Sequence, residues 1–166
     1  RKLSTRPKMD NEEFIGYCKK INEISNRLHD EGIPMSYHGH MGTIIQTQDE
    51  IDKFIENTNK NTFLLYDTGH LHFAQADYKR ILKNYISKIN HVHCKDIRQN
   101  VLENSLENDL SFRESFLEGV FTVPGDGCID YEQFFKILNK NNYEKWLIIE
   151  AEQDPKKANP LEYAKI

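Results

Sequence analysis

The sequence predicts an α/β protein that corresponds to the C-terminal part, about five β/α units, of a (β/α)8 barrel. Apolar runs with strand character alternate with segments of helical periodicity, as in βαβ units that form a parallel sheet. The residues that end the apolar runs recur at intervals of 26 to 30, and eight such units approach the roughly 250 residues of a complete barrel. We therefore expect residues 1–166 to be one partial-barrel catalytic domain without its N-terminal strands.

Helices are predicted where a capping residue precedes an amphipathic stretch. Capping boxes, in which the cap and the third helical residue bond reciprocally, are expected at Asp10 with Glu13 and at Thr47 with Glu50. Asp77 and Asp130 are expected to begin two further helices. Residues 112–117 are predicted as a short helix or a docking segment, and Pro160 as the start of a last helix.

Five strands are predicted between these helices, at residues 34–38, 62–67, 91–96, 120–123 and 146–150. The fourth is short and is followed by a Pro-Gly-Asp-Gly turn signal. Residues 68–69 are expected to be a turn of small residues. Residues 99–111 are polar and are predicted as a long loop of the kind that often serves as a lid.

Composition excludes several classes of protein. The net charge of −4 gives no attraction to nucleic acid or to an anionic membrane. No apolar run approaches the length of a membrane span, and no signal peptide is present. The three cysteines are far apart and form no C-x-x-C motif, which favours a reducing, cytoplasmic setting. The oligomeric state is left open, a homo-oligomer included.

Six of the seven histidines occur in three H-x-H pairs, at or just after the predicted strand ends. Residues i and i+2 of a strand point to the same face, so one pair could present two ligands together. The alternative is that one histidine of each pair packs beneath the loop while its neighbour acts. The pairs are His38/His40, His70/His72 and His91/His93.

Asp67, Glu150 and one histidine of the His91/His93 pair share a position, because each ends a predicted strand. In parallel sheets the working groups lie where the strands end. Carboxylates and imidazole without a thiolate suit Mn²⁺, Co²⁺, Mg²⁺ or Zn²⁺. Such an ion can chelate a ketone oxygen and the neighbouring hydroxyl and stabilise an enediolate after proton removal.

Simpler interpretations exist for single residues. Asp67 could be only a helix cap or turn residue, and Lys95 and Asp96 could form a mutual ion pair. Glu152 competes with Glu150, because it shares its face of the strand. A carboxylate that ends a buried strand is costly unless a charged group meets it, which favours a functional interpretation of Glu150.

Five stretches carry a resemblance to the inosose dehydratases, within the xylose-isomerase-like barrel superfamily. The two specific ones are Phe-Thr-Val-Pro-Gly-Asp-Gly at residues 121–127 and Glu-Ala-Glu-Gln-Asp-Pro at residues 150–155. The stretches at residues 37–43, 67–71 and 91–96 also match. The resemblance extends over nearly the whole chain.

The resemblance implies a lyase of myo-inositol catabolism. It would dehydrate 2-keto-myo-inositol (scyllo-inosose), a small polyol ketone, to a trihydroxycyclohexane-1,2-dione by loss of a β-hydroxyl. It also implies a divalent metal, Mn²⁺ or Co²⁺ above all, and glutathione. Carried over to this sequence, it makes Asp67, His93 and Glu150 the metal ligands.

Further roles follow from the same resemblance and from the chemistry of the side chains. His70 matches a substrate-hydroxyl contact, and Arg98 lies near the position of a substrate-binding arginine. Related enzymes often have a glutamate where this chain has the first H-x-H pair, so His38 or His40 is expected to complete the metal sphere or contact substrate.

Proton transfer needs a base and an acid. Glu150 or Glu152 is the expected base, with a pKa raised toward neutrality by burial, and His70 or Lys95 the expected acid. A sugar or keto-inositol isomerase or epimerase on the same barrel is the nearest alternative, since it starts from the same enediolate. A metal-dependent endonuclease and a non-catalytic interaction module are more distant ones, and the acidic balance disfavours the endonuclease.

Overall fold

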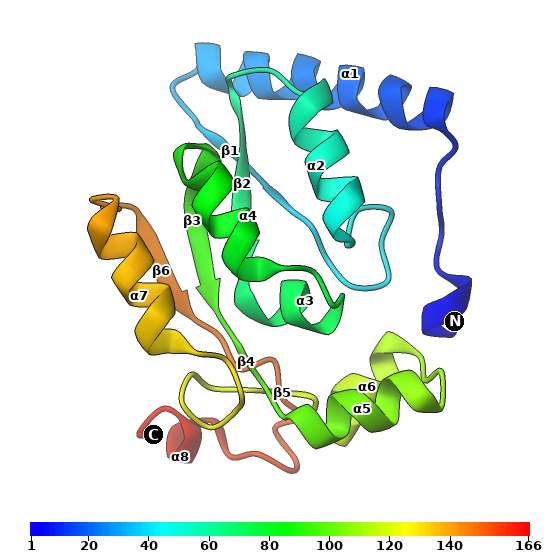
Figure 1. The fold of residues 1–166 in the computed structure, drawn as a ribbon, viewed down its shortest axis with the longest axis vertical. Coiled ribbons are helices and arrows are strands. Elements are labelled where there is room, and N and C mark those ends of the chain that lie inside the picture. The colour runs from blue at the N-terminus through cyan, green and yellow to red at the C-terminus, as the bar shows by residue number, and fades with distance from the viewer.

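The computed structural model describes residues 1–166 and contains a four-stranded parallel sheet (Figure 1). Its strands are β1 (Met35–His38), β2 (Thr62–Asp67), β3 (Ile89–Cys94) and β6 (Trp146–Ile149). Neighbours pair in parallel, in the order β1-β2-β3-β6. Strand order therefore follows chain order, as in a segment of a barrel, and the predicted α/β partial-barrel class is confirmed.

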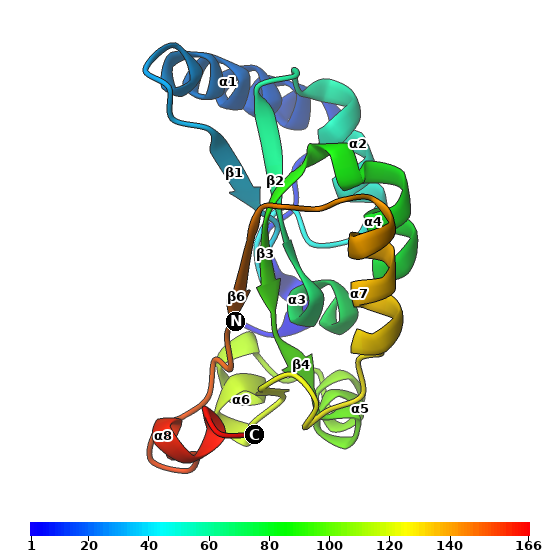
Figure 2. The ribbon, with the colours of Figure 1, turned by 90° about the vertical axis from the view of Figure 1, so that its left-hand side faces the viewer.

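Helices cover one face of this sheet. α2 (Gln48–Asn57), α4 (Tyr78–Tyr85) and α7 (Tyr131–Lys140) lie on the same side, while α1 (Asn11–Asp30) crosses the end at which the strands begin (Figure 2). Apolar side chains of these helices and of the strands form the larger core. It includes Phe14, Phe54, Tyr66, Ile81, Leu82, Val92 and Phe134.

The predicted helix starts are confirmed. Asp10 forms a capping box with Glu13, and Thr47 forms one with Glu50. Asp77 accepts a hydrogen bond from the Arg80 amide, and Asp130 does the same for Gln133. Each cap satisfies an amide of the first turn, which otherwise has no partner within the helix.

The fifth predicted barrel strand does not belong to the parallel sheet. Only Phe121–Thr122 (β5) is extended, and it pairs in antiparallel fashion with β4 (Asp96–Ile97). The reason lies in the buried Asp96 carboxylate, which accepts from the amides of Ile97, Gly125 and Ile129 and holds the turn after β5 against β4. The chain thus supplies four barrel strands, not five, and β3 pairs directly with β6.

The polar segment 99–111 is not the predicted loop. It contains α5 (Gln99–Glu107), and α6 (Phe112–Glu118) follows after a short turn. Only Leu102 and Ser105 of α5 are buried. Hydrophobic periodicity does not reveal a helix with so few buried apolar residues. The Ser111–Glu114 capping box begins α6, which confirms a helix at 112–117. Together with Phe73, Ile97 and Phe121, these helices form a second, smaller core.

The remaining helices are short. α3 (Thr68–Phe73) replaces the predicted turn after β2, and α8 (Pro160–Tyr163) begins at Pro160 as predicted. Single 3₁₀ turns lie at Leu3–Thr5 and Ile86–Lys88. No helix combines the length and the apolar character that crossing a bilayer requires.

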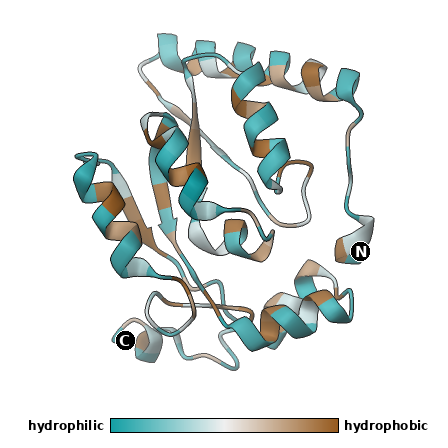
Figure 3. Cartoon of the chain, viewed as in Figure 1, coloured by the Kyte–Doolittle hydropathy of each residue, from teal (hydrophilic) through white to brown (hydrophobic).

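One edge of the sheet is open. All four residues of β6 are exposed, and Trp146 and Ile149 keep 71% and 73% of their surface accessible. β2 and β6 are mainly hydrophobic and β3 alternates, whereas the helices carry hydrophobic and hydrophilic bands (Figure 3). The helices thus follow the amphipathic pattern expected of a barrel's outer layer, and β6 is an edge strand with an uncovered apolar surface.

We expect Gly127→Ala to destabilise the β4–β5 region by about 1–3 kcal/mol, the usual cost of forcing extra atoms into a packed site. A Cβ at Gly127 would lie 2.3 Å from Asp96 Oδ1 and 2.5 Å from the Ile97 carbonyl oxygen. Gly16→Ala is the matched control, because nothing lies within 4 Å of a Cβ there and alanine favours helix by roughly 1 kcal/mol. Urea unfolding should show opposite signs for the two variants, and equal midpoints would contradict the prediction.

Candidate active site

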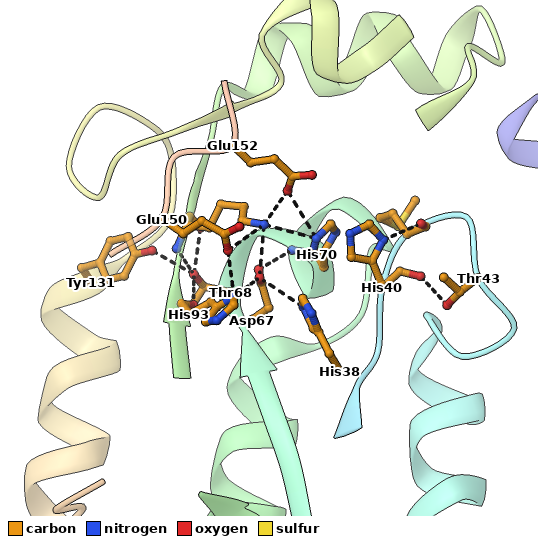
Figure 4. Close-up of polar contacts among 12 residues, drawn as sticks. His38, His40, Thr43, Asp67, Thr68, His70, His93, Tyr131, Glu150 and Glu152 are labelled. Carbon is orange, nitrogen blue, oxygen red and sulfur yellow. Dashed lines mark hydrogen bonds and ion pairs between the residues drawn. The ribbon is translucent and has the colours of Figure 1, made fainter. Parts of the chain in front are cut away.

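The side chains of Asp67, His93 and Glu150 converge at the end of the sheet where β2, β3 and β6 finish (Figure 4). His93 Nδ1 lies 2.7 Å from Glu150 Oε2 and 3.4 Å from Asp67 Oδ2. The register explains this, because Asp67 pairs with His93 and the next residue of β3 pairs with Ile149, immediately before Glu150. The sequence-based expectation that these three side chains meet is confirmed.

The two oxygens of Asp67 do different things. Oδ1 accepts a hydrogen bond of 2.9 Å from the His70 amide and caps α3. Oδ2 faces the convergence point and has no hydrogen-bond partner there. The cap interpretation of Asp67 is therefore confirmed for Oδ1, and Oδ2 remains available for the predicted role as a ligand.

The atoms at the convergence point fit a divalent cation. Asp67 Oδ2, His93 Nδ1 and Glu150 Oε2 lie within 4.8 Å of one another, and His38 Nε2 is 3.3 Å from Asp67 Oδ2. These buried atoms make ion-pair contacts with one another or with Lys95, but none makes a hydrogen bond of acceptable geometry. Buried polar atoms without partners are costly unless something satisfies them. Two carboxylate oxygens and two imidazole nitrogens are a donor set that suits Mn²⁺, Co²⁺ or Zn²⁺.

His38 rather than His40 is placed to complete this donor set. His38 Nε2 lies 3.3 Å from Asp67 Oδ2. His40 points its Nδ1 at the Met41 carbonyl oxygen, 2.8 Å away, and its ring lies against the ring of His70 at a centroid distance of 3.7 Å. The two histidines of the first H-x-H pair thus have different surroundings, and their roles stay a prediction.

Burial and neighbouring groups shift the pKa values of these ligands. Burial raises the pKa of Asp67, but its contacts with His38 and His93 and the charge of Lys95 outweigh burial and leave it well below its usual range. The contacts with Asp67 and Glu150 raise the pKa of His93 to about 9. Without a metal, the site therefore holds a carboxylate pair around a protonated imidazole.

Lys95 lies at the centre of the site and has no exposed surface. Its Nζ is 3.0 Å from Glu150 Oε2, 3.3 Å from Asp67 Oδ2 and 2.5 Å from Glu152 Oε2. These carboxylates outweigh the effect of burial, which lowers the pKa of a lysine, and raise its pKa. Lys95 does not pair with Asp96, because the Asp96 carboxylate is occupied by backbone amides.

Glu152 and His70 complete the charged cluster. Glu152 Oε2 lies 3.5 Å from His70 Nε2 in addition to its contact with Lys95. Burial raises the pKa of Glu152, but His70 and Lys95 outweigh burial and lower it to about 2. Burial lowers the pKa of His70 to about 4.

These pKa values bear on two chemical expectations. A carboxylate base with a pKa raised toward neutrality is not found. The contact with His93 and the charge of Lys95 lower the pKa of Glu150, and the contact with His70 and the charge of Lys95 lower the pKa of Glu152, in both cases against the effect of burial. The lowered pKa of His70 favours its neutral form near pH 7, whereas the pKa of Lys95 is raised, so Lys95 is the stronger candidate for the acid. The role of either residue as the acid stays a prediction.

Arg98 makes its contacts outside this cluster. Its guanidinium donates to the carbonyl oxygens of Gly119 and Phe121, and it pairs with Asp126 at 2.9 Å. These bonds tie β4 to β5, so the side chain has a structural task. Its role in substrate binding stays a prediction.

Sequence reasoning missed the residues that support Lys95. Thr68 Oγ1 bonds to both the amide and the carbonyl of Lys95 and to the hydroxyl of Tyr131, 2.8 Å away. The ring of Phe121 lies 4.9 Å from Nζ. A Cβ on Gly69 would lie 2.8 Å from Lys95 Cγ, so this glycine makes room for the lysine stem. The Thr-Gly pair after Asp67 was the only local signal, and it also fits a simple turn.

A parallel β/α sheet whose strand ends gather carboxylates and imidazoles has the arrangement of the active-site end of a β/α barrel. The family described as xylose isomerase-like TIM barrel matches residues 3–165, and the chain belongs to this family.

Two similar proteins are inosose dehydratases. The one from Bacillus velezensis is 43% identical over 162 residues, which are 97% of this chain and 54% of that protein. The one from Clostridium beijerinckii is 49% identical over 154 residues, 92% of this chain and 52% of that protein. The resemblance to inosose dehydratases is thereby confirmed. The chain spans about half the length of these relatives.

Solved structures share the fold. The IOLI protein, whose crystal structure contains a zinc atom, has a TM-score of 0.68 at 20% identity over 98% of this chain and 53% of that one. The probable 3-DHS dehydratase AsbF from Bacillus anthracis has a TM-score of 0.69 at 15% identity over 90% of this chain and 54% of that one.

Metal affinity should rise with pH from 6 to 8. A metal ligand must be deprotonated, and the pKa of His93 is about 9, so each bound ion displaces one proton and the affinity should rise roughly tenfold per pH unit. Asp67 and Glu150 are already ionised and add no further dependence. Calorimetric titration with Mn²⁺ in buffers of different ionisation enthalpy measures both quantities. An affinity that does not change over this range would show that His93 is not a ligand.

Proposed function

We propose that the chain is the site-bearing part of a metal-dependent lyase that dehydrates 2-keto-myo-inositol to a trihydroxycyclohexane-1,2-dione. The observation that carries the proposal is the adjacency of a cation site and a proton-transfer pair. Asp67, His93 and Glu150 offer ligand atoms within 4.8 Å of one another, and Lys95 and Glu152 lie in contact beside them. The inosose dehydratases, which are 43–49% identical in the examples above, supply the substrate class.

The ligand atoms of Asp67, His93, Glu150 and His38 would hold the cation. When bound, a divalent ion supplies Lewis-acid stabilisation of the negative charge that develops on a ketone oxygen during proton removal. Mn²⁺ or Co²⁺ is the proposed ion. Glutathione is proposed only from the family resemblance, and no residue of the site is assigned to it.

Glu152 is the proposed base and Lys95 the proposed acid. Glu152 takes the proton next to the ketone, and the Lys95 ammonium gives a proton to the departing β-hydroxyl, which leaves as water. The low pKa of Glu152 comes in part from Lys95, so the carboxylate becomes more basic as Lys95 gives up its proton. Because the two groups touch, the proton on Glu152 can return to Lys95 and restore the starting state.

His70 and His40 are proposed to contact substrate hydroxyls. Their rings lie against each other, and His70 is adjacent to both Lys95 and Glu152. A neutral imidazole can accept a hydrogen bond from a hydroxyl at one nitrogen and donate one at the other. The pair would therefore orient a polyol without carrying charge into the site.

Asp67→Asn and Glu150→Gln should each lose bound metal and at least about a hundredfold in turnover, because a first ligand is removed. The assay is release of the dione from scyllo-inosose, followed by ultraviolet absorbance, with metal content measured on the same sample. Full activity after exhaustive chelation would remove the metal from the reaction.

Glu152→Gln should keep the metal and lose turnover by about 10²–10⁴-fold, the usual contribution of a general base. This variant separates proton transfer from metal binding, since Glu152 is not among the proposed ligands. If substrate is converted to another keto-inositol without a dione, the activity is that of an isomerase or epimerase and the proposed dehydration is wrong.

A further inference from the structure

We propose that the ammonium group of Lys95 occupies the place of a second divalent cation and thereby limits the site to a single metal ion. This inference rests on the proposed function in one respect, which is that Asp67, His93 and Glu150 bind the first ion. It concerns how many ions the site takes and does not depend on which substrate is converted.

Three sets of ligand atoms lie at this end of the sheet, and one of them, His38, Asp67 and His70, shares a residue with each of the other two. Those other two sets share no residue with each other. The first is Asp67, His93 and Glu150, and the second is His40, His70 and Glu152. The atoms within each set lie within 4.8 Å of one another. Two imidazoles and one carboxylate are a donor set that binds divalent ions in many proteins, so the second set is by its chemistry a metal site as well.

The spacing within the second set also suits an ion. Two ligands about 2.1 Å from a tetrahedral ion lie roughly 3.4 Å from each other. His70 Nε2 and Glu152 Oε2 are 3.5 Å apart. An ion between these two atoms would need no movement of either side chain.

Lys95 already brings a positive charge to that position. Its Nζ is 3.2 Å from His70 Nε2 and 2.5 Å from Glu152 Oε2. The same atom is 3.3 Å from Asp67 and 3.0 Å from Glu150, which belong to the first set. An ion held about 2.1 Å from both His70 Nε2 and Glu152 Oε2 would lie within roughly 3.5 Å of Nζ. Two positive charges this close repel each other strongly in a buried site, so the ammonium disfavours a second ion.

Lys95 cannot leave easily. It has no exposed surface, and its stem runs so close to Gly69 that an added Cβ there would lie 2.8 Å from Lys95 Cγ. The ring of Phe121 and the hydroxyl of Thr68 hold its two ends. A tethered cation that is held this way competes with free ions without a cost in binding entropy.

The balance of charges also favours a single bound metal ion. Three carboxylates, those of Asp67, Glu150 and Glu152, surround Nζ within 3.3 Å. One ammonium and one divalent ion neutralise them, whereas two divalent ions beside the lysine would leave excess positive charge in a buried site. Removal of the lysine charge leaves a net negative site that favours a second ion.

The experiment is titration of the purified protein with Mn²⁺, with bound metal measured by plasma mass spectrometry and by electron paramagnetic resonance. The wild type should bind one ion, and Lys95→Met should bind two and show the spectrum of an exchange-coupled pair. Lys95→Met combined with Glu152→Gln should return to one ion, because the second set then lacks its carboxylate. Lys88→Met is the matched control and should stay at one, since Lys88 Nζ bonds the Asn59 carbonyl at the opposite end of β2.

Two outcomes would overturn the inference: a second ion bound by the wild type, or a folded Lys95→Met protein that still binds one. Circular dichroism checks the fold, and Lys95→Gln is the second variant if the methionine protein does not fold. The dehydration assay is separate from this count. Failure of the proposed function would appear as absence of the dione with the stoichiometries intact, whereas failure of this inference would leave dione release by the wild type unchanged.

Discussion

The candidate site depends on one electrostatic arrangement, the buried ammonium of Lys95 surrounded by the carboxylates of Asp67, Glu150 and Glu152. A buried lysine without partners would lose its proton or destabilise the fold by several kcal/mol. Three carboxylates without a cation would repel one another in the same way. Each half of the cluster is therefore stable only because the other is present, and the local sequence is adapted to both.

That adaptation explains details that do not look functional in isolation. Gly69 leaves space for the lysine stem, and Thr68 binds the lysine backbone while it takes part in the first turn of α3. Asp67 caps a helix with one oxygen and faces the carboxylate–imidazole cluster with the other. The short segment from Asp67 to His70 thus orients a proposed metal ligand, a helix and a buried ammonium together.

The parallel sheet places these groups together at the carboxyl ends of its strands. In a parallel sheet the carboxyl ends of all strands lie on the same side, so ligands on β2, β3 and β6 meet once the register is set. The antiparallel β4–β5 pair then closes around Arg98 and Asp96 and brings Phe121 beneath Lys95.

The sequence by itself determined the parallel α/β class, the four N-caps and the three side chains that meet at the strand ends. Each of these follows from a local pattern: hydrophobic periodicity, capping chemistry or the end of an apolar run. Only the tertiary structure decided that the segment 120–123 leaves the parallel sheet and that 99–111 is helical, because the Asp96 carboxylate and the second core are built from distant residues. The tertiary structure also determined which carboxylates contact Lys95. Lys95 reaches Glu152 across 57 residues of sequence, and no local pattern reports that contact or the change in acidity that it causes.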